Sequence, residues 1–213
     1  QGFVETHTPD AAEVEPLAHF LFEENKYKLH ACCHGTHAMI EALLAASADK
    51  TMALDAVAGL TLRTNPRWLK VCDIKVPRTG LEVKFSYAWL AGMVLRGDRT
   101  GDDRVYTDIL AGDGTLSEFA RKVEVIGEEG VSDLQTFGTL MLKGGAKIPL
   151  HFDLVDPMPD EVLAGRLRQK AEGMLGDEGA GLWDLAGELD SQSARIIGSW
   201  LGSVPSELTR ASG

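Results

Sequence analysis

The spacing of apolar residues along the chain predicts strands and helices up to about residue 153 and helices alone beyond it. Two long apolar segments are predicted to form buried helices, at 36–48 and 84–96. Further helices are predicted at 116–120, 159–175, 182–189 and 193–201. Short or alternating apolar segments bounded by turn-forming residues predict strands at 58–64, 69–76, 122–126, 135–142 and 147–153.

This change in pattern divides the chain into three parts. Residues 1–27 form a lead-in with a predicted helix at 10–22, residues 28–156 combine strands with helices, and residues 157–213 are helical. We therefore predict an α+β fold, in which a small mixed sheet with packed helices is followed by C-terminal helices.

Ionisable and nucleophilic residues are concentrated between residues 27 and 37, directly before the first long apolar segment. They are one lysine, three histidines and two cysteines: Lys28, His30, His34, His37, Cys32 and Cys33. Gly35 is unfavourable inside a helix and Thr36 is a good cap, so the helix is predicted to begin here with His37 in its first turn. A helix N-terminus attracts anions. This polar region therefore predicts a pocket for a carboxylate substrate, with groups that can move a proton beside it.

The composition narrows the classes of partner. The chain has 213 residues and a net charge of −11, which argues against nucleic acid and anionic membrane surfaces. No apolar segment approaches the roughly 20 residues that a membrane span needs. Three cysteines, two of them adjacent, do not form the pattern of a secreted disulfide framework, so we expect a cytoplasmic protein. The first residue is Gln1 rather than methionine, and we expect the chain to be processed or part of a longer protein.

Two motifs in order resemble the MmgE/PrpD family. The first is Lys28-x3-Cys32-Cys33-x2-Thr36-His37 before an apolar helix, and the second is Glu82-x-Lys84-Phe85-Ser86 before another. Pro77-x-Thr79 ahead of the second motif and Pro159-Asp160 ahead of the late helices are also similar to that family. The family includes 2-methylcitrate dehydratase, cis-aconitate decarboxylase and iminodisuccinate epimerase.

The resemblance implies a large all-helical domain and a smaller α+β lid domain, with the active site in the cleft between them. It also implies a homodimer that uses no metal and no organic cofactor. On this basis residues 28–156 are the lid, residues 1–27 lead in from the helical domain, and residues 157–213 return to it. We find no counterpart of the N-terminal helical domain, a partner that would belong to the same protein, and we expect this chain to be inactive alone.

The resemblance also implies roles for individual residues at the motif positions. Lys28 and His37 are the predicted catalytic residues, and the predicted substrate-binding residues are His30, His34, Lys84, Ser86, Tyr87 and Trp89. The chain departs from the family at Ala31, where proline is frequent, and at Trp89, where tyrosine is frequent; Tyr87 lies two residues earlier. A displaced tyrosine changes the proton relay, so decarboxylation is not carried over, and dehydration and epimerisation both stay open.

Both remaining reactions require a base that takes a proton from carbon beside a carboxylate of a small polycarboxylate. They also require positive charge that stabilises the resulting state. Lys28 can supply this charge, or act as the base if desolvation lowers its pKa. His37 can move the proton, and His30 and His34 can bind carboxylates.

Other hypotheses compete with this one. Cys32 and Cys33 with the histidines could bind zinc, but adjacent cysteines cannot easily both ligate one ion and no second pair follows, so no metal is predicted. A thiol nucleophile is a further alternative, although burial beside the helix is the better interpretation. The chain could also be a non-catalytic carboxylate-binding or interaction module of the same fold. Finally, it could be a structural fragment that associates through its last helices.

Overall fold

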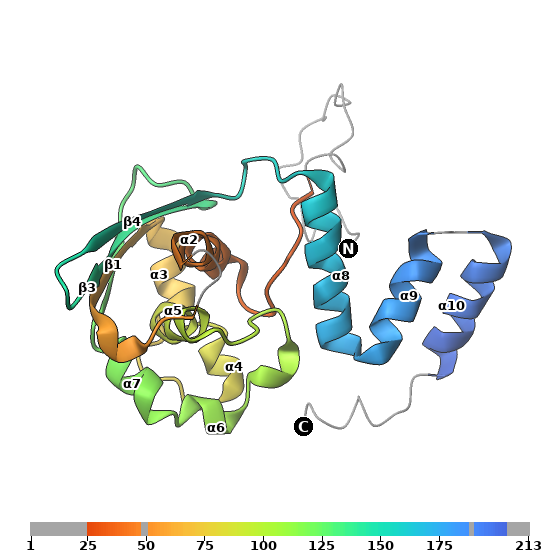
Figure 1. Cartoon of the computed structure of the whole chain (residues 1–213), viewed down its shortest axis with the longest axis horizontal. Helices are drawn as coiled ribbons and strands as arrows, with labels where there is room; N and C mark the ends of the chain where they lie inside the picture. Colours follow the sequence, from red (N-terminus) through yellow and green to blue (C-terminus); the bar gives the residue numbers. More distant parts are fainter. Residues whose placement is uncertain (1–24, 48–50, 188–189, 204–213) are drawn as a thin grey trace, which may run out of the picture.

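The computed structural model describes residues 25–47, 51–187 and 190–203, and its elements are shown in Figure 1. A four-stranded sheet is packed against helices, and three further helices follow it in the chain, so the predicted α+β fold is confirmed. The helix predicted at 10–22 lies outside the described residues. Among the helices that are described, none combines the length and apolar character needed to cross a bilayer.

The sheet is mixed and has the strand order β2-β1-β3-β4. Its strands are β1 (Val57–Thr64), β2 (Val123–Gly127), β3 (Gln135–Leu142) and β4 (Lys147–Asp153). β1 pairs in parallel with β2 and antiparallel with β3, and β3 pairs antiparallel with β4. Gly145, with a φ of 86°, forms the predicted hairpin turn between β3 and β4. Four of the five predicted strands are therefore confirmed to within one residue at each end.

Two helices, α2 (His37–Ser47) and α5 (Tyr87–Arg96), pack against each other and against the sheet (Figure 1). Every residue of α5 from Tyr87 to Leu95 is buried. The largest fully buried side chains are Trp89, Tyr87, Phe119, Met39, Ile40, Leu43, Leu60, Leu62, Leu90, Met93, Leu95 and Leu116. Because burial of one large apolar side chain contributes about 1.5–3 kcal/mol, this layer is the main source of stability.

Short helices complete the layer around α5, and three longer ones follow β4. The short elements are α3 (Pro66–Cys72), α4 (Gly80–Val83), α6 (Asp108–Ala111) and α7 (Gly114–Ala120), with 3-10 turns at His34–Thr36, Leu54–Ala56 and Asp103–Val105. The later helices are α8 (Asp160–Leu175), α9 (Asp177–Gly187) and α10 (Ser191–Ser203), in agreement with the predicted series. The assignment of 1–27, 28–156 and 157–213 to separate domains stays a prediction.

The strand predicted at 69–76 is wrong, because α3 occupies the first part of this segment as a helix. The Asn65 side chain accepts a hydrogen bond from the Arg67 backbone N–H at 3.0 Å and so caps the helix. Pro66 stands in the first turn, where its fixed φ suits a helix and its missing N–H costs nothing. The Asn65–Pro66 pair therefore begins a helix as well as ending β1.

The helix predicted at 84–96 is real but begins at Tyr87. Ser86 is its N-cap, as predicted, and its hydroxyl accepts a hydrogen bond from the Trp89 backbone N–H at 3.3 Å. The residues before it belong to the separate helix α4, which apolar spacing did not reveal because it is only one turn long.

The turn before α2 is fixed by close contacts with α3 and α5. Gly35 lies against the indole of Trp68, and a Cβ atom at Gly35 would come within 2.4 Å of a ring carbon. The indole is itself held, since Trp68 Nε1 donates to the Asp133 carbonyl at 2.8 Å. From α5, the Tyr87 hydroxyl donates to the Gly35 carbonyl at 2.7 Å. These contacts fix the direction in which the chain enters α2 at His37.

We expect Gly35→Ala to lower the free energy of unfolding by about 1–3 kcal/mol, the usual cost of forcing extra atoms into a packed site. Urea unfolding followed by circular dichroism measures this change. Gly114→Ala is the matched control, because no atom lies within 4 Å of its Cβ position. Equal stability of Gly35→Ala and the wild type would show that the turn can move away from the indole.

Candidate functional site

The polar region predicted between residues 27 and 37 runs between α8 and α2 (Figure 1). Backbone hydrogen bonds attach it to two loops that are distant in sequence. The Ala31 N–H donates to the Thr100 carbonyl at 2.8 Å, and the Cys33 N–H donates to the Lys84 carbonyl at 3.1 Å. A 3-10 turn then leads into α2, which begins at His37, one residue later than predicted, and His37 lies in its first turn, as predicted.

The structure brings the three predicted histidines together. The ring centroids of His30 and His37 are 5.0 Å apart, and those of His34 and His37 are 5.2 Å apart. His30 and His37 are buried, whereas His34 is half-buried. Lys28 is exposed, and its positive charge adds to the effect of burial in lowering the pKa of His34 and of His37. We call His30, His34 and His37 the imidazole cluster.

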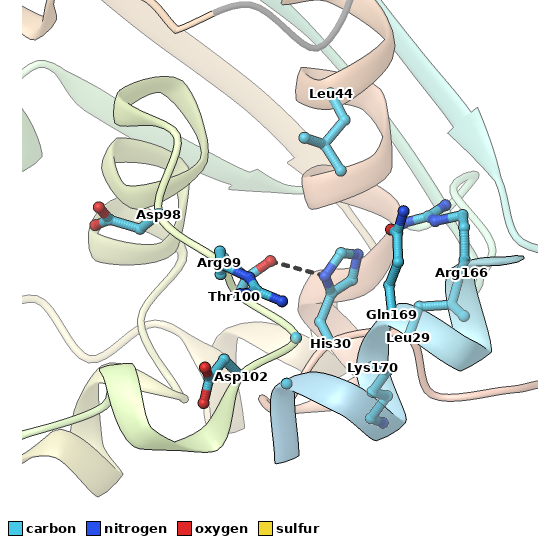
Figure 2. Close-up of a pocket in the computed structure, with 12 residues that line it drawn as sticks. Leu29, His30, Leu44, Asp98, Arg99, Thr100, Asp102, Arg166, Gln169 and Lys170 are labelled. Carbon is cyan, nitrogen blue, oxygen red and sulfur yellow. Dashed lines mark hydrogen bonds between the residues drawn. The ribbon is translucent and has the colours of Figure 1, made fainter. Parts of the chain in front are cut away.

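A buried carboxylate of α2, Glu41, contacts this cluster. Glu41 Oε1 accepts a hydrogen bond from His30 Nε2 at 2.7 Å. Arg166 of α8 donates to both carboxylate oxygens of Glu41, each at 2.6 Å. The other ring nitrogen of His30, Nδ1, lies 2.8 Å from Thr100 Oγ1 (Figure 2). A continuous hydrogen-bonded series therefore joins α8, α2, the polar region and the loop after α5.

The positive charge of Arg166 balances the negative charge of Glu41, so His30 need not be protonated. Burial alone would raise the pKa of Glu41, but hydrogen bonds from His30 and Arg166 lower it to about 2. Burial, aided by the charges of Arg166 and Lys170, lowers the pKa of His30 although Glu41 acts to raise it. His30 is therefore neutral near pH 7, so its Nε2–H donates to the carboxylate and its Nδ1 accepts from the Thr100 hydroxyl.

His37 differs from His30 because one of its ring nitrogens has no partner. Its Nε2 is buried and makes no hydrogen bond to any described residue. Burial, and then the neighbouring His30, His34 and Lys28, lower the pKa of His37 to about 3. Most buried polar atoms in proteins are hydrogen-bonded, so an unpaired one requires an explanation. A neutral imidazole with an unpaired nitrogen can bind, or exchange a proton with, a molecule that enters the site.

Three predicted residues, at the end of the second motif and in the helix that follows it, lie in the core. Ser86 caps α5, and the Tyr87 hydroxyl, besides its bond to the Gly35 carbonyl, lies 3.1 Å from the Thr64 hydroxyl. Trp89 is only 2 % exposed, and its Nε1 donates to a backbone carbonyl of α6 at 3.3 Å. These contacts explain the three side chains as structural groups, and their role in substrate binding stays a prediction.

Lys84, the fourth predicted residue of that motif, forms an ion pair with Asp103. Its ammonium group also lies 5.1 Å from the centre of the Tyr106 ring. Its backbone carbonyl supports the polar region through Cys33, as described above. A role for the Lys84 side chain in binding substrate likewise stays a prediction.

The thiol of Cys32, beside the imidazole cluster, is protonated at neutral pH. Cys32 Sγ lies 3.3 Å from Thr36 Oγ1, and burial raises the pKa of Cys32 to about 11. Burial also raises the pKa of Cys72 in the core. A thiolate nucleophile at Cys32 or Cys72 is therefore disfavoured at neutral pH. In the described part of the chain, no three His, Cys, Asp or Glu side chains are arranged so that they could hold a metal ion.

Two cavities border the polar region and share Leu29 in their walls. The first has a volume of about 260 Å³ and is lined by His34, Glu41, residues 25–27 and the segment that connects β4 to α8. The second has a volume of about 430 Å³, contains His30 in its wall, and lies between α8 and the loop after α5 (Figure 2). The imidazole cluster can therefore be approached from two sides.

Sequence reasoning missed Glu41, Thr100 and Arg166. Glu41 carries a recognisable signal, because it is the single acidic residue in the apolar segment that forms α2. A buried acid needs a cation or hydrogen-bond donors. Arg166, its cation, lies 125 positions away in the chain, so no local spacing identifies it.

Comparison with known proteins places the chain in a family. A family model described as the MmgE/PrpD C-terminal domain matches residues 30–137, about half of the chain. The chain belongs to the MmgE/PrpD family. The resemblance seen in the two motifs is thereby confirmed, and members of this family are generally enzymes, dehydratases or isomerases. The comparison with curated proteins gives no match.

Within this MmgE/PrpD chain, the matched region contains the imidazole cluster, Glu41 and Thr100. Lys28 precedes the matched region. This region ends at residue 137, within β3, and Arg166 lies after it, in α8. The site therefore also includes two cations from outside the matched region, Lys28 before it in the chain and Arg166 after it.

We expect Glu41→Gln to lower the free energy of unfolding by about 2 kcal/mol, because it leaves Arg166 partly buried without a counter-charge. Urea unfolding near neutral pH measures this loss. Glu129→Gln, an exposed glutamate, is the matched control and should change the stability by about 0.5 kcal/mol or less. A Glu41→Gln protein as stable as this control would mean that the series of hydrogen bonds does not contribute to stability.

The low pKa of His37 predicts acid sensitivity. The unfolded chain binds a proton at this residue near the ordinary pKa of 6.5, whereas the folded chain binds it only near pH 3. Stability therefore falls as the pH drops from 6.5 towards 3, by at most about 1.4 kcal/mol per pH unit for one such group. We expect His37→Asn to reduce the loss of unfolding free energy between pH 7 and pH 5 by about 2 kcal/mol.

His151→Asn, which changes an exposed histidine of β4, is the control for this measurement. Its stability should depend on pH as that of the wild type does. The same dependence in His37→Asn would contradict the burial of a neutral imidazole at this position.

Proposed function

We propose that this chain supplies part of the active site of an MmgE/PrpD-like enzyme that removes a proton next to a carboxylate of a small polycarboxylate. The parent reaction is either the dehydration of a 2-methylcitrate-like substrate, a lyase reaction, or the epimerisation of an iminodisuccinate-like substrate, an isomerase reaction. The observation that carries the proposal is the buried, unpaired Nε2 of His37. A neutral imidazole with one unpaired nitrogen can act as the base in proton abstraction.

In this proposal His37 is the base, and the bound substrate raises its pKa. With a pKa of about 3, the imidazole is too weak a base on its own. A polyanion bound beside it favours the protonated ring and raises the pKa towards the working pH. His34, half-buried and 5.2 Å from His37 between ring centroids, lies where it can bind the incoming carboxylate.

Lys28 provides the positive charge that the reaction needs. Its effect on the pKa of both His34 and His37 supports its placement near the reacting groups. A fixed cation stabilises the negative charge that develops on the substrate when the proton leaves. We assign Lys28 to this electrostatic role and the proton transfer to His37.

The proposed partners follow from the family. A helical domain of the same protein would close the site over Lys28 and His34, and the enzyme would be a homodimer that uses no cofactor. Residues 28–156 would act as the lid, and α8 to α10 would belong to the helical domain. The net charge of −11 supports the absence of nucleic acid and of anionic membranes among the partners.

A second candidate is a carboxylate-binding module without turnover. The side chain of His37 favours it, since this residue is only 1 % exposed and cannot meet a substrate without some opening. This candidate predicts that polycarboxylates change the environment of the imidazole cluster but never exchange their carbon-bound protons.

Proton exchange in heavy water tests the proposal. NMR would follow the carbon-bound protons of 2-methylcitrate, citrate, cis-aconitate and iminodisuccinate, with this chain alone and with a form that carries the family's N-terminal helical domain. We expect turnover only in the longer form, and a loss of at least about 100-fold in His37→Asn, the usual contribution of a general base. His151→Asn should retain full activity.

Lys28→Met should retain substrate exchange at a strongly reduced rate, because it removes charge and not the base. Full activity of the His37→Asn enzyme would contradict the assignment of the base. Binding of all four compounds without exchange by the longer form would favour the binding module.

A further inference from the structure

The three cysteines of the chain lie close together at the start of α2, and the proposed reaction uses none of them. Cys32 and Cys33 directly precede the 3-10 turn that leads into α2. Cys72 is the last residue of α3, which packs against this turn. All three side chains are free thiols. The fold therefore gathers oxidisable groups beside the imidazole cluster from two separate segments of the chain.

The two adjacent cysteines make different contacts. Cys32 Sγ lies 3.3 Å from Thr36 Oγ1 and also contacts the side chain of Tyr106. The thiol of Cys33 is instead hydrogen-bonded to the thiol of Cys72. Cys33 and Cys72 therefore form a pair, which we call the dithiol pair, and Cys32 stands outside it.

Packing around the turn keeps the dithiol pair in contact. The Trp68 indole of α3 lies against Gly35, two residues after Cys33. From α5, the Tyr87 hydroxyl donates to the Gly35 carbonyl at 2.7 Å. Burial raises the pKa of Tyr87, and Cys72 and Cys33 act in the same direction, which places both sulfurs near this hydroxyl. The turn, α3 and α5 thus hold the two sulfurs together.

The two members of the dithiol pair differ in their access to solvent. Cys33 is half-buried, whereas Cys72 is fully buried. A small oxidant can therefore reach Cys33 but not Cys72. An accessible thiol next to a second cysteine is the arrangement of redox-sensing pairs, in which the first thiol is oxidised and the second forms a disulfide with it.

We propose that Cys33 and Cys72 form a reversible disulfide when the protein meets a hydroperoxide, and that this bond shifts the imidazole cluster. The Cys33 sulfur attacks one oxygen of the hydroperoxide, and the O–O bond breaks. The Cys33 proton leaves with the other oxygen as water or an alcohol, and Cys33 becomes a sulfenic acid. The Cys72 sulfur then bonds to the Cys33 sulfur, the S–O bond breaks, and the hydroxide leaves with the Cys72 proton as water.

The electrons balance, because the two thiols together lose two electrons and the hydroperoxide gains them. The second step has to overcome the weak acidity of Cys72, since burial and the contact with Cys33 raise its pKa. Contact between the two sulfurs offsets this disadvantage, because reacting groups that are already held together react faster than separate molecules do. A dithiol reductant such as dithiothreitol reverses the reaction by thiol–disulfide exchange.

The disulfide would reach the imidazole cluster through the backbone of Cys33. This residue directly precedes His34, and its N–H donates to the Lys84 carbonyl at 3.1 Å. Its carbonyl accepts from the Thr36 N–H at 3.1 Å and from the Thr36 hydroxyl at 2.7 Å. A covalent bond to Cys72 brings the Cys33 sulfur closer to α3 than the hydrogen bond does. The turn that carries His34 has to follow, so oxidation repositions the imidazole rings without reacting with them.

Peptide mapping by mass spectrometry of the 213-residue chain tests the disulfide. The protein is treated with a small excess of hydrogen peroxide, blocked with N-ethylmaleimide in denaturant, and digested with trypsin without reduction. We expect tryptic peptide 29–50 to be joined to peptide 71–75, and dithiothreitol to separate them. The joined peptides should be absent in Cys33→Ser and in Cys72→Ala. They should remain in Cys32→Ala, the matched control, because Cys32 lies outside the dithiol pair.

Two results of the mapping would overturn the proposal. The first is a linked product that persists in Cys33→Ser and is lost in Cys32→Ala, which would make Cys32 the partner of Cys72. The second is oxidation of Cys33 to a sulfinic acid in the wild type with no linked product. Circular dichroism confirms that each variant is folded. If Cys72→Ala is unfolded, Cys33→Ser supplies the comparison, because its side chain is only half-buried.

NMR of the histidine ring protons tests the effect on the imidazole cluster. The signals of His34 and His37, assigned with His34→Asn and His37→Asn, should shift when the wild type is oxidised and return with dithiothreitol. They should not shift in Cys33→Ser under the same treatment. A linked product without any shift of these signals would overturn the switch. The proposed proton abstraction would be unaffected by that result, because it uses no thiol.

Discussion

The geometry of the candidate site depends on the Glu41 carboxylate. A buried carboxylate is costly unless it is paired and hydrogen-bonded, and here both of its oxygens are bound by Arg166 while one also accepts from His30. The arginine comes from α8 and the histidine from the segment that precedes α2, so a single charge fixes three parts of the chain. Because the arginine already balances the carboxylate, His30 has no need of a positive charge and acts as a neutral link to the Thr100 hydroxyl.

A neutral His30 avoids charge repulsion within the imidazole cluster, because the ring centroids of neighbouring histidines are only 5.0 and 5.2 Å apart. Two protonated rings about 5 Å apart repel each other by about 3 kcal/mol at an effective dielectric constant near 20. Burial of His37 acts in the same direction, so its imidazole, without a ligand, becomes protonated and charged only near pH 3. A bound polyanion would favour the protonated imidazoles, since its charge offsets both the repulsion between the rings and their loss of hydration. In the function that we propose, the cluster would therefore favour anionic ligands through the energetics of protonation as well as through Lys28.

The local parts of this arrangement could be predicted from the sequence, whereas the long-range parts could not. Alternating apolar residues located β1 to β4, and the Ser86 hydroxyl marked the start of α5, because both signals act over a few residues. The segment after Asn65 was misassigned because a capping residue followed by proline ends a strand and begins a helix with the same two residues. The spacing of three histidines before α2 predicted the cluster, but the contacts of Thr100 and Arg166 arise from tertiary packing. Only the isolated acid in α2, Glu41, indicated that such a partner had to exist.

The contact between α8 and the rest of the molecule differs in kind from the contacts in the core. α2 and α5 are held by large apolar side chains, whereas the single residue of α8 that is fully buried is Gly173. What attaches α8 is polar: the Arg166 pair with Glu41 and the hydrogen bond that Lys170 donates to the Lys28 carbonyl. Polar contacts of this type depend on charge and on solvent more than packed apolar layers do. The two cavities beside the polar region border these contacts, because Arg166 and Lys170 line one cavity and Glu41 lines the other. The position of α8 therefore depends on two cations, Arg166 and Lys170, whereas the packed core depends on apolar burial.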